Sequence, residues 1–275
     1  MPATANAASP FRVAAVQTVA GPVLERNLAV AEELVGDAAD QGARLVALPE
    51  WFCFIGASDR DKLALAERDG DGEIQAALAR IAAKHRVWLI GGTLPLATAH
   101  ADRVRNSCLV FDEAGRRVAR YDKIHLFGLD LETEKFQESH TIEPGTTPVA
   151  IDSPFGRIGL SVCYDVRFPE LYRALGPVDI VAVPSAFTVP TGQAHWETLL
   201  RARAIENLAW VIAPAQGGRH PTGRVTYGHS MIVDPWGKVL ASLAEGPGVV
   251  VAEIDPTYKD RVRAALPALD HRVLR

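Results

Sequence analysis

The sequence predicts an α/β fold in which mixed sheets are covered by helices, as in a layered sandwich. Short apolar segments rich in β-branched residues alternate with segments whose apolar residues recur at helical spacing. No linker, low-complexity stretch or internal repeat interrupts this alternation. Residues 11–275 are therefore expected to form a single domain, and the small, polar residues 1–10 a disordered tail.

The first half of the chain is expected to contain three buried strands and two helices, followed by a hairpin. The strands are Phe11–Gln17, Arg44–Pro49 and Val87–Leu96. One helix begins near Asn27, with Leu28, Ala31, Leu34, Val35 and Ala38 on one face, and the second covers Glu73–His85 with Ile74, Ala77, Leu78 and Ile81 on one face. Two further strands flank the turn-forming Glu113-Ala114-Gly115.

The second half continues the same pattern. Strands are expected at Arg157–Val162, Asp179–Val183 and 209–215, and helices at Phe168–Leu175 and Ala194–Glu206. Gly176-Pro177 is a typical end for the first of these helices. Hairpins follow around Asp234-Pro235-Trp236-Gly237.

Composition excludes several classes of protein. The net charge of −4 shows no basic surplus for nucleic acid or anionic lipid, and no apolar run approaches the length of a membrane span. Three cysteines without a C-x-x-C spacing argue against a disulfide framework or structural zinc and for a reducing, cytoplasmic location. The eight histidines lack metal-ligand spacing, and the Gly-rich nucleotide-binding motifs are missing. No metal or cofactor is expected.

Three chemically reactive residues stand at or just after the ends of predicted strands. Glu50 follows one buried strand, Lys123 follows the second hairpin strand, and Cys163 lies where a strand turns into a helix. Carboxyl ends of strands are where layered α/β folds build sites. A nucleophile on such a turn is exposed beside backbone N–H groups that can stabilise an oxyanion.

Each residue taken alone also has a structural interpretation. A cysteine in an apolar run is most often an inert core residue, and this interpretation is kept for Cys53 and Cys108. Glu50 could cap a helix, and Lys123 could be a surface charge. The residues by themselves leave both interpretations open.

Three blocks of sequence resemble the signature of the nitrilase superfamily of carbon–nitrogen hydrolases. They are Leu48-Pro49-Glu50, Asp122-Lys123-Ile124-His125-Leu126 and Cys163-Tyr164-Asp165-x-Arg167-Phe168-Pro169-Glu170, and the resemblance extends from Ala15 to about Val273. It implies a four-layer αββα sandwich, stacked as αββααββα in a homodimer.

The resemblance also implies roles for four residues of a cysteine-dependent amidohydrolase. Glu50 is then the general base, Lys123 the cationic stabiliser and Cys163 the nucleophile that forms an acyl thioester. The second family glutamate matches Glu138. Glu143 competes for this assignment, but Glu143-Pro144-Gly145 is typical of a turn, so Glu138 is preferred.

The carboxy-terminal half contains Thr191-Gly192-x-Ala194-His195-Trp196-Glu197, Gln216-x-Gly218-Arg219-His220 and Tyr227-Gly228-His229-Ser230. These stretches resemble the Nit branch, in particular the subgroup associated with cleavage of deaminated glutathione to 2-oxoglutarate and cysteinylglycine. A small-molecule amide with two carboxylates would need cations or N–H groups in its pocket. The candidates are the backbone N–H of Tyr164 and the side chains of Phe127, Arg167, Phe187, Thr188, Arg219 and His220. The alternatives are an omega-amidase acting on 2-oxoglutaramate, an N-carbamoyl amino acid amidohydrolase, and a catalytically silent binding protein.

Overall fold

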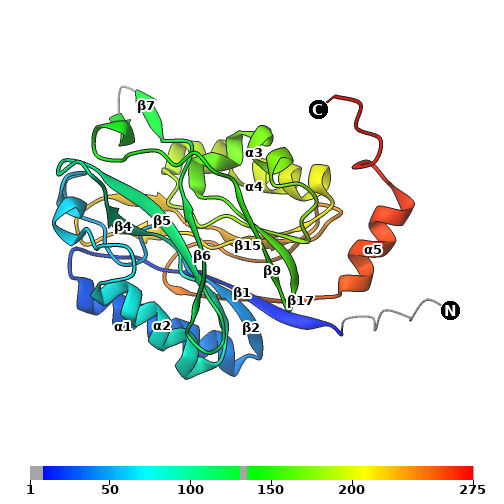
Figure 1. Ribbon diagram of the computed structural model, residues 1–275, viewed down its shortest axis with the longest axis horizontal. Coiled ribbons are helices and arrows are strands. Elements are labelled where there is room, and N and C mark those ends of the chain that lie inside the picture. The colour runs from blue at the N-terminus through cyan, green and yellow to red at the C-terminus, as the bar shows by residue number, and fades with distance from the viewer. Residues whose placement is uncertain (1–8, 131–134, 275) are drawn as a thin grey trace.

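Two mixed β-sheets lie face to face at the centre of the molecule (Figure 1). The computed structural model describes residues 9–130 and 135–274. The first sheet has the order β17 (Gly248–Ile254), β1 (Phe11–Gln17), β2 (Ala43–Ala47), β3 (Trp88–Ile90), β5 (Val104–Phe111) and β4 (Leu94–Ala97), with β6 (Arg117–Asp122) paired to β5. The second has the order β16 (Val239–Leu243), β15 (Ser230–Val233), β12 (Trp210–Ala213), β11 (Ile180–Ala182), β10 (Gly156–Leu160) and β9 (Val149–Ser153).

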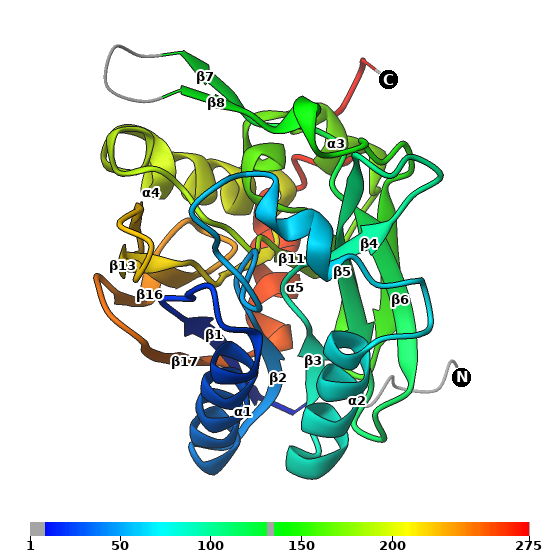
Figure 2. The same ribbon diagram turned by 90° about the vertical axis from the view of Figure 1, so that its left-hand side faces the viewer.

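Helices cover the outer faces of both sheets. Helices α1 (Leu24–Asp40) and α2 (Glu73–His85) lie side by side on the first sheet (Figure 2). Helices α3 (Pro169–Ala174) and α4 (Val189–Asn207) cover the second, and α5 (Pro256–Ala265) follows β17. This arrangement confirms the predicted four-layer αββα sandwich.

Short elements complete the chain between these layers. Two small hairpins, β7 (Gly128–Asp130) with β8 (Lys135–Gln137) and β13 (Gly217–Arg219) with β14 (Val225–Tyr227), stand outside the main sheets. Three 3₁₀ helices, η1 (Asp61–Leu65), η2 (Glu138–His140) and η3 (Cys163–Arg167), lie in the loops. The candidate site is built from these loops.

The central strands are apolar throughout because both of their faces are buried. In β1, Val13 and Ala15 belong to the core between the sheets, whereas Ala14 and Val16 face the layer of α1 and α2. Side chains alternate across a strand, so a strand covered on both sides loses the usual apolar–polar alternation. This explains the continuous apolar runs in the sequence.

Two helices begin earlier than their sequence patterns predict. Helix α1 begins at Leu24, and α4 begins at Val189 although its periodic residues start near Ala194. Pro190 stands in the first turn of α4. Proline is tolerated there because its missing N–H has no partner within the helix at that position.

The prediction of one strand over Val87–Leu96 is wrong, because the chain turns at Gly92 between β3 and β4. Gly92 has φ +58°, and a Cβ atom there would lie 2.2 Å from the carbonyl oxygen of Pro49. Only glycine permits this close approach. The turn places Thr93 so that its hydroxyl accepts a hydrogen bond from the Trp51 N–H at 2.9 Å, which holds the backbone beside Glu50.

Most of the predicted tail, residues 1–8, lies outside the described residues. Ser9 and Pro10 are exposed and precede β1. Within 9–130 and 135–274, no helix combines the length and apolarity needed to cross a membrane.

The two-sheet core predicts a strong dependence of stability on burial. Val181 in β11 is fully buried, whereas Val118 in β6 is 42% exposed. We expect Val181→Ala to lower the free energy of unfolding by roughly 2 kcal/mol or more, because it removes buried methyl groups and leaves a cavity. Val118→Ala is the matched control, with an expected change within about 0.5 kcal/mol. Chemical denaturation measures both, and equal losses would contradict this account of the core.

Candidate active site

Cys163 stands at a sharp turn at the end of a central strand of the second sheet. The chain leaves β10, and Cys163 opens η3 with φ +51°, a conformation that is uncommon for residues other than glycine. Its N–H donates to the carbonyl of Pro184 at 2.9 Å, beyond the end of β11. The residue is 7% exposed and borders a cavity. Strained backbone of this kind is concentrated at functional sites.

The ammonium group of Lys123 lies between two carboxylates. Its Nζ is 2.9 Å from Glu50 Oε1 and 2.8 Å from Glu138 Oε2. Glu50 comes from the loop after β2, Lys123 follows β6, and Glu138 opens η2. The lysine side chain is fully buried, so its charge depends on these two partners.

The charges in the cluster define its resting protonation. Burial opposes charge on Lys123, but the carboxylates of Glu138 and Glu50 outweigh it and raise the pKa of Lys123 well above its ordinary value. Burial raises the pKa of the Cys163 thiol well above its ordinary value, and the negative charge of Glu50 adds to this, against the opposing charge of Lys123. At neutral pH the cluster therefore holds an ammonium and a neutral thiol, and the thiol needs a base to become a nucleophile.

The two side-chain oxygens of Glu50 differ in their hydrogen bonds. Oε1 accepts hydrogen bonds from both Lys123 Nζ and Asn106 Nδ2, each at 2.9 Å. Among the described residues, no hydrogen bond uses Oε2. The backbone carbonyl of Glu50 accepts from Gln216 Nε2 at 3.1 Å, which fixes the main chain. The sequence analysis missed Asn106, whose only signal is a polar side chain inside the buried strand β5.

Asp165 joins the lysine segment to the cysteine turn. Its Oδ2 accepts hydrogen bonds from the Tyr121 hydroxyl at 2.7 Å and the Val162 N–H at 2.8 Å. Its Oδ1 accepts from the N–H of His125 at 3.0 Å and lies 2.8 Å from His125 Nδ1. Asp165 is fully buried, and no role was predicted for it although it stands in the cysteine block.

A small cavity opens beside Cys163, and five of the predicted pocket residues line it. The lining consists of Phe127, Cys163, Tyr164, Arg167, Ala186, Phe187, Thr188 and Thr191. The N–H of Tyr164 has no hydrogen-bond acceptor among the described residues. The guanidinium of Arg167 lies 5.6 Å from the ring centre of Tyr164 and 5.7 Å from that of Phe187. The space beside Cys163 is small, about 10 Å³.

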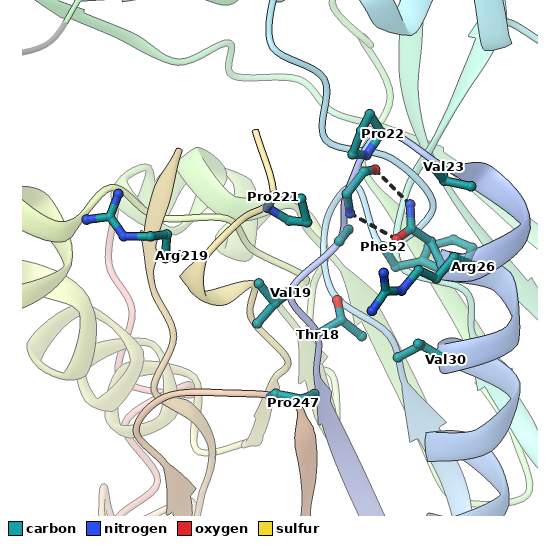
Figure 3. Close-up of a pocket in the computed structure, with 13 residues that line it drawn as sticks. Thr18, Val19, Pro22, Val23, Arg26, Val30, Phe52, Arg219, Pro221 and Pro247 are labelled. Carbon is teal, nitrogen blue, oxygen red and sulfur yellow. Dashed lines mark hydrogen bonds between the residues drawn. The ribbon is translucent and has the colours of Figure 1, made fainter. Parts of the chain in front are cut away.

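The structure does not bring Arg219 and His220 to this cavity. Arg219 lines a separate cavity of about 420 Å³ near Val19 and Pro221 (Figure 3). His220 is buried, with Nδ1 2.7 Å from the carbonyl oxygen of Ala20 and Nε2 2.8 Å from Thr226 Oγ1. Burial also lowers the pKa of His220. Both of its ring nitrogens are already in use within the protein.

No cluster of three or more His, Cys, Asp or Glu side chains able to hold a metal ion is found within 9–130 and 135–274. The two carboxylates of the cluster, Glu50 and Glu138, both bind the ammonium of Lys123. A fixed internal cation therefore balances part of their charge.

The protonation of Cys163 predicts how its reactivity depends on pH. Because burial and the Glu50 charge raise the pKa of the thiol, the thiolate fraction should keep growing as pH increases. We expect the rate of alkylation by iodoacetamide to rise through pH 9 without a plateau near pH 7. Mass spectrometry locates the label, with Cys163→Ala as the unlabelled control. A plateau below pH 8 would contradict the assignment of a neutral resting thiol.

Comparison with known proteins shows the family of the chain. Residues 12–264 match the family of carbon–nitrogen hydrolases. The chain is 44% identical over 270 residues to a protein named deaminated glutathione amidase from Synechocystis sp.. The aligned region covers 96% of this chain and 98% of that protein.

Solved structures share the fold. Saccharomyces cerevisiae Nit3, a member of branch 10 of the nitrilase superfamily, has a TM-score of 0.86 and 31% identity, over 99% of this chain and 100% of that one. A mutant of the amidase from Nesterenkonia sp. AN1, whose structure shows the result of Michael addition of acrylamide at the active site cysteine, has a TM-score of 0.78 and 29% identity, over 94% and 98% of the two chains. The chain belongs to the carbon–nitrogen hydrolase family and is a hydrolase of carbon–nitrogen bonds other than peptide bonds.

Proposed function

We propose that the protein hydrolyses deaminated glutathione to 2-oxoglutarate and cysteinylglycine, with Cys163 as the nucleophile. The amidase chemistry rests on one observation, the thiol beside an ammonium that is held between two carboxylates. The substrate is supported by relatives named deaminated glutathione amidase, which are 39–44% identical over nearly the whole chain.

The first half of the reaction forms an acyl thioester. Glu50 takes the proton of the Cys163 thiol through its free Oε2, and the sulfur attacks the amide carbonyl carbon. The carbonyl oxygen becomes an oxyanion, which Lys123 and the Tyr164 N–H stabilise. Loss of one such donor typically costs about 10²- to 10³-fold in rate.

The second half releases the products. Glu50 passes its proton to the amide nitrogen, the carbon–nitrogen bond breaks, and the amine leaves. Water then attacks the thioester while Glu50 accepts its proton, and collapse of the new tetrahedral intermediate releases the acid and returns the proton to the Cys163 sulfur. Glu138 keeps Lys123 charged and in place throughout, because both of its oxygens lie within hydrogen-bonding distance of Nζ.

The residues around Cys163 suit the 2-oxoglutaryl part of this substrate. Arg167 supplies a cation for its carboxylate, while Phe127 and Phe187 form apolar walls. Thr188 adds a hydroxyl, which lies 2.8 Å from that of Thr191. The homodimer, the cytoplasmic location and the single-domain organisation stay predictions of the sequence.

Removal of the nucleophile tests the mechanism. We expect Cys163→Ala to abolish release of 2-oxoglutarate from deaminated glutathione, because no thioester can form, while the free energy of unfolding changes little. A coupled assay for 2-oxoglutarate measures the loss, and Cys108→Ala, which changes a fully buried thiol elsewhere in the core, is the matched control. Full activity of Cys163→Ala would show that another group attacks the amide.

A panel of substrates tests the specificity. We expect the wild-type protein to turn over deaminated glutathione with a higher kcat/KM than 2-oxoglutaramate or an N-carbamoyl amino acid. A preference for 2-oxoglutaramate would identify an omega-amidase, and turnover of the N-carbamoyl compound alone would identify a carbamoylase. No turnover of any of the three would favour a catalytically silent binding protein.

A further inference from the structure

A second small cavity lies next to the Glu50–Lys123–Glu138 cluster. It is lined by Trp51, Phe54, Ile55, Gly56, Ser58, Asp59, Lys62 and Arg224 and has a volume of about 30 Å³. This is room for about two water-sized groups, such as the two oxygens of a carboxylate. It shares no lining residue with the cavity beside Cys163.

The walls of this cavity come from the segments that hold the two glutamates. Trp51 directly follows Glu50. Lys62 Nζ lies 3.4 Å from the hydroxyl of Thr141, three residues after Glu138. On the other side, the guanidinium of Arg224 lies 5.0 Å from the ring centre of Phe136, whose ring centre is 5.7 Å from that of Phe127 in the Cys163 cavity. The ring of Phe136 therefore neighbours a lining residue of each cavity, Arg224 in this one and Phe127 in the other.

The lining of the cavity contains two cationic side chains, Lys62 and Arg224, and one carboxylate, Asp59. Lys62 is 9% exposed, and its nearest carboxylate, Asp59, is 3.9 Å away and 46% exposed. Arg224 Nε is buried without a hydrogen-bond partner among the described residues. Burial lowers the pKa of Lys62, the carboxylates of Asp59 and Glu138 oppose this, and the charges of Arg224 and Lys123 lower it further. Glu138 is already paired with Lys123, so the two cations in the lining have one partly exposed carboxylate beside them and form a site that a second anion would stabilise.

The proposed substrate has such an anion in its leaving group. Deaminated glutathione carries one carboxylate on the 2-oxoglutaryl side of the scissile amide and a second on the glycine of cysteinylglycine. An extended dipeptide places this second carboxylate about 7 Å from the scissile nitrogen. Arg167 faces the Cys163 cavity, so the glycine carboxylate needs a different cation.

Resting on the proposed function, we propose that Lys62 and Arg224 form the subsite for the glycine carboxylate of the leaving cysteinylglycine. Arginine can bind a carboxylate through two parallel hydrogen bonds, and lysine adds a point charge. The subsite makes the enzyme select amides whose leaving amine bears a distal carboxylate. An omega-amide substrate releases only ammonia and gains nothing from it.

The test compares deaminated glutathione with its analogue in which the glycine carboxylate is replaced by a carboxamide. For the wild-type protein we expect kcat/KM to be about 10- to 100-fold higher for the acid than for the carboxamide, the usual effect of hydrogen bonds to a charged group. In Lys62→Met and in Arg224→Leu this ratio should fall toward one, mainly through a higher KM for the acid. The ratio cancels any loss of folded protein, because both substrates report on the same sample.

Lys238→Met, a change of an exposed lysine, is the matched control and should keep the wild-type ratio. A wild-type ratio near one, or an unchanged ratio in both site variants, overturns the subsite and leaves the proposed function intact. If the wild-type protein releases no 2-oxoglutarate from either compound, the proposed function fails and the subsite fails with it.

Discussion

The buried ammonium of Lys123 is the constraint on which the rest of the site depends. A charge taken out of water is tolerated only when partners replace the lost hydration. Glu50 and Glu138 provide that replacement at 2.9 and 2.8 Å, and they come from distant parts of the chain. The loop after β2, the end of β6 and η2 must therefore meet at one point, and this point lies beside Cys163.

The cluster holds Lys123 and Cys163 in different charge states. Two carboxylates hold Lys123 as a cation, while burial and the charge of Glu50 keep Cys163 as a thiol. Asn106 and Lys123 both bind one oxygen of Glu50, so the other oxygen can accept a proton. Asp165 adds rigidity, because its four short contacts tie the cysteine turn to Tyr121 and His125.

In the proposed function, two sites with cationic side chains set the length and the charge of the substrate. Arg167 lies in the cavity of Cys163, and Lys62 with Arg224 lies beyond the glutamates. A substrate that reaches both must carry anions on either side of its scissile bond. In the proposed arrangement, the Lys62–Arg224 site is costly to bury without a ligand, and this cost favours a substrate that brings the matching carboxylate.

The sequence by itself determined the layers of the fold and predicted the reactive residues. Its apolar periodicity predicted most strands and helices, and three short blocks resembled the family signature and predicted Glu50, Lys123 and Cys163 as site residues. These features are local, because residues close together in the sequence define both the periodicity and the motifs. Where local signals were incomplete, the prediction failed, as at Gly92, whose turn depends on close approach to the distant carbonyl of Pro49.

Only the tertiary structure decided which side chains share a cavity. It placed Arg167 beside Cys163, placed Arg219 in another cavity and engaged both nitrogens of His220 within the protein. It also brought together Asn106 with Glu50, and Lys62 with Arg224. These neighbours are far apart in the chain, and their proximity depends on how the loops pack at the ends of both sheets, which no local pattern encodes.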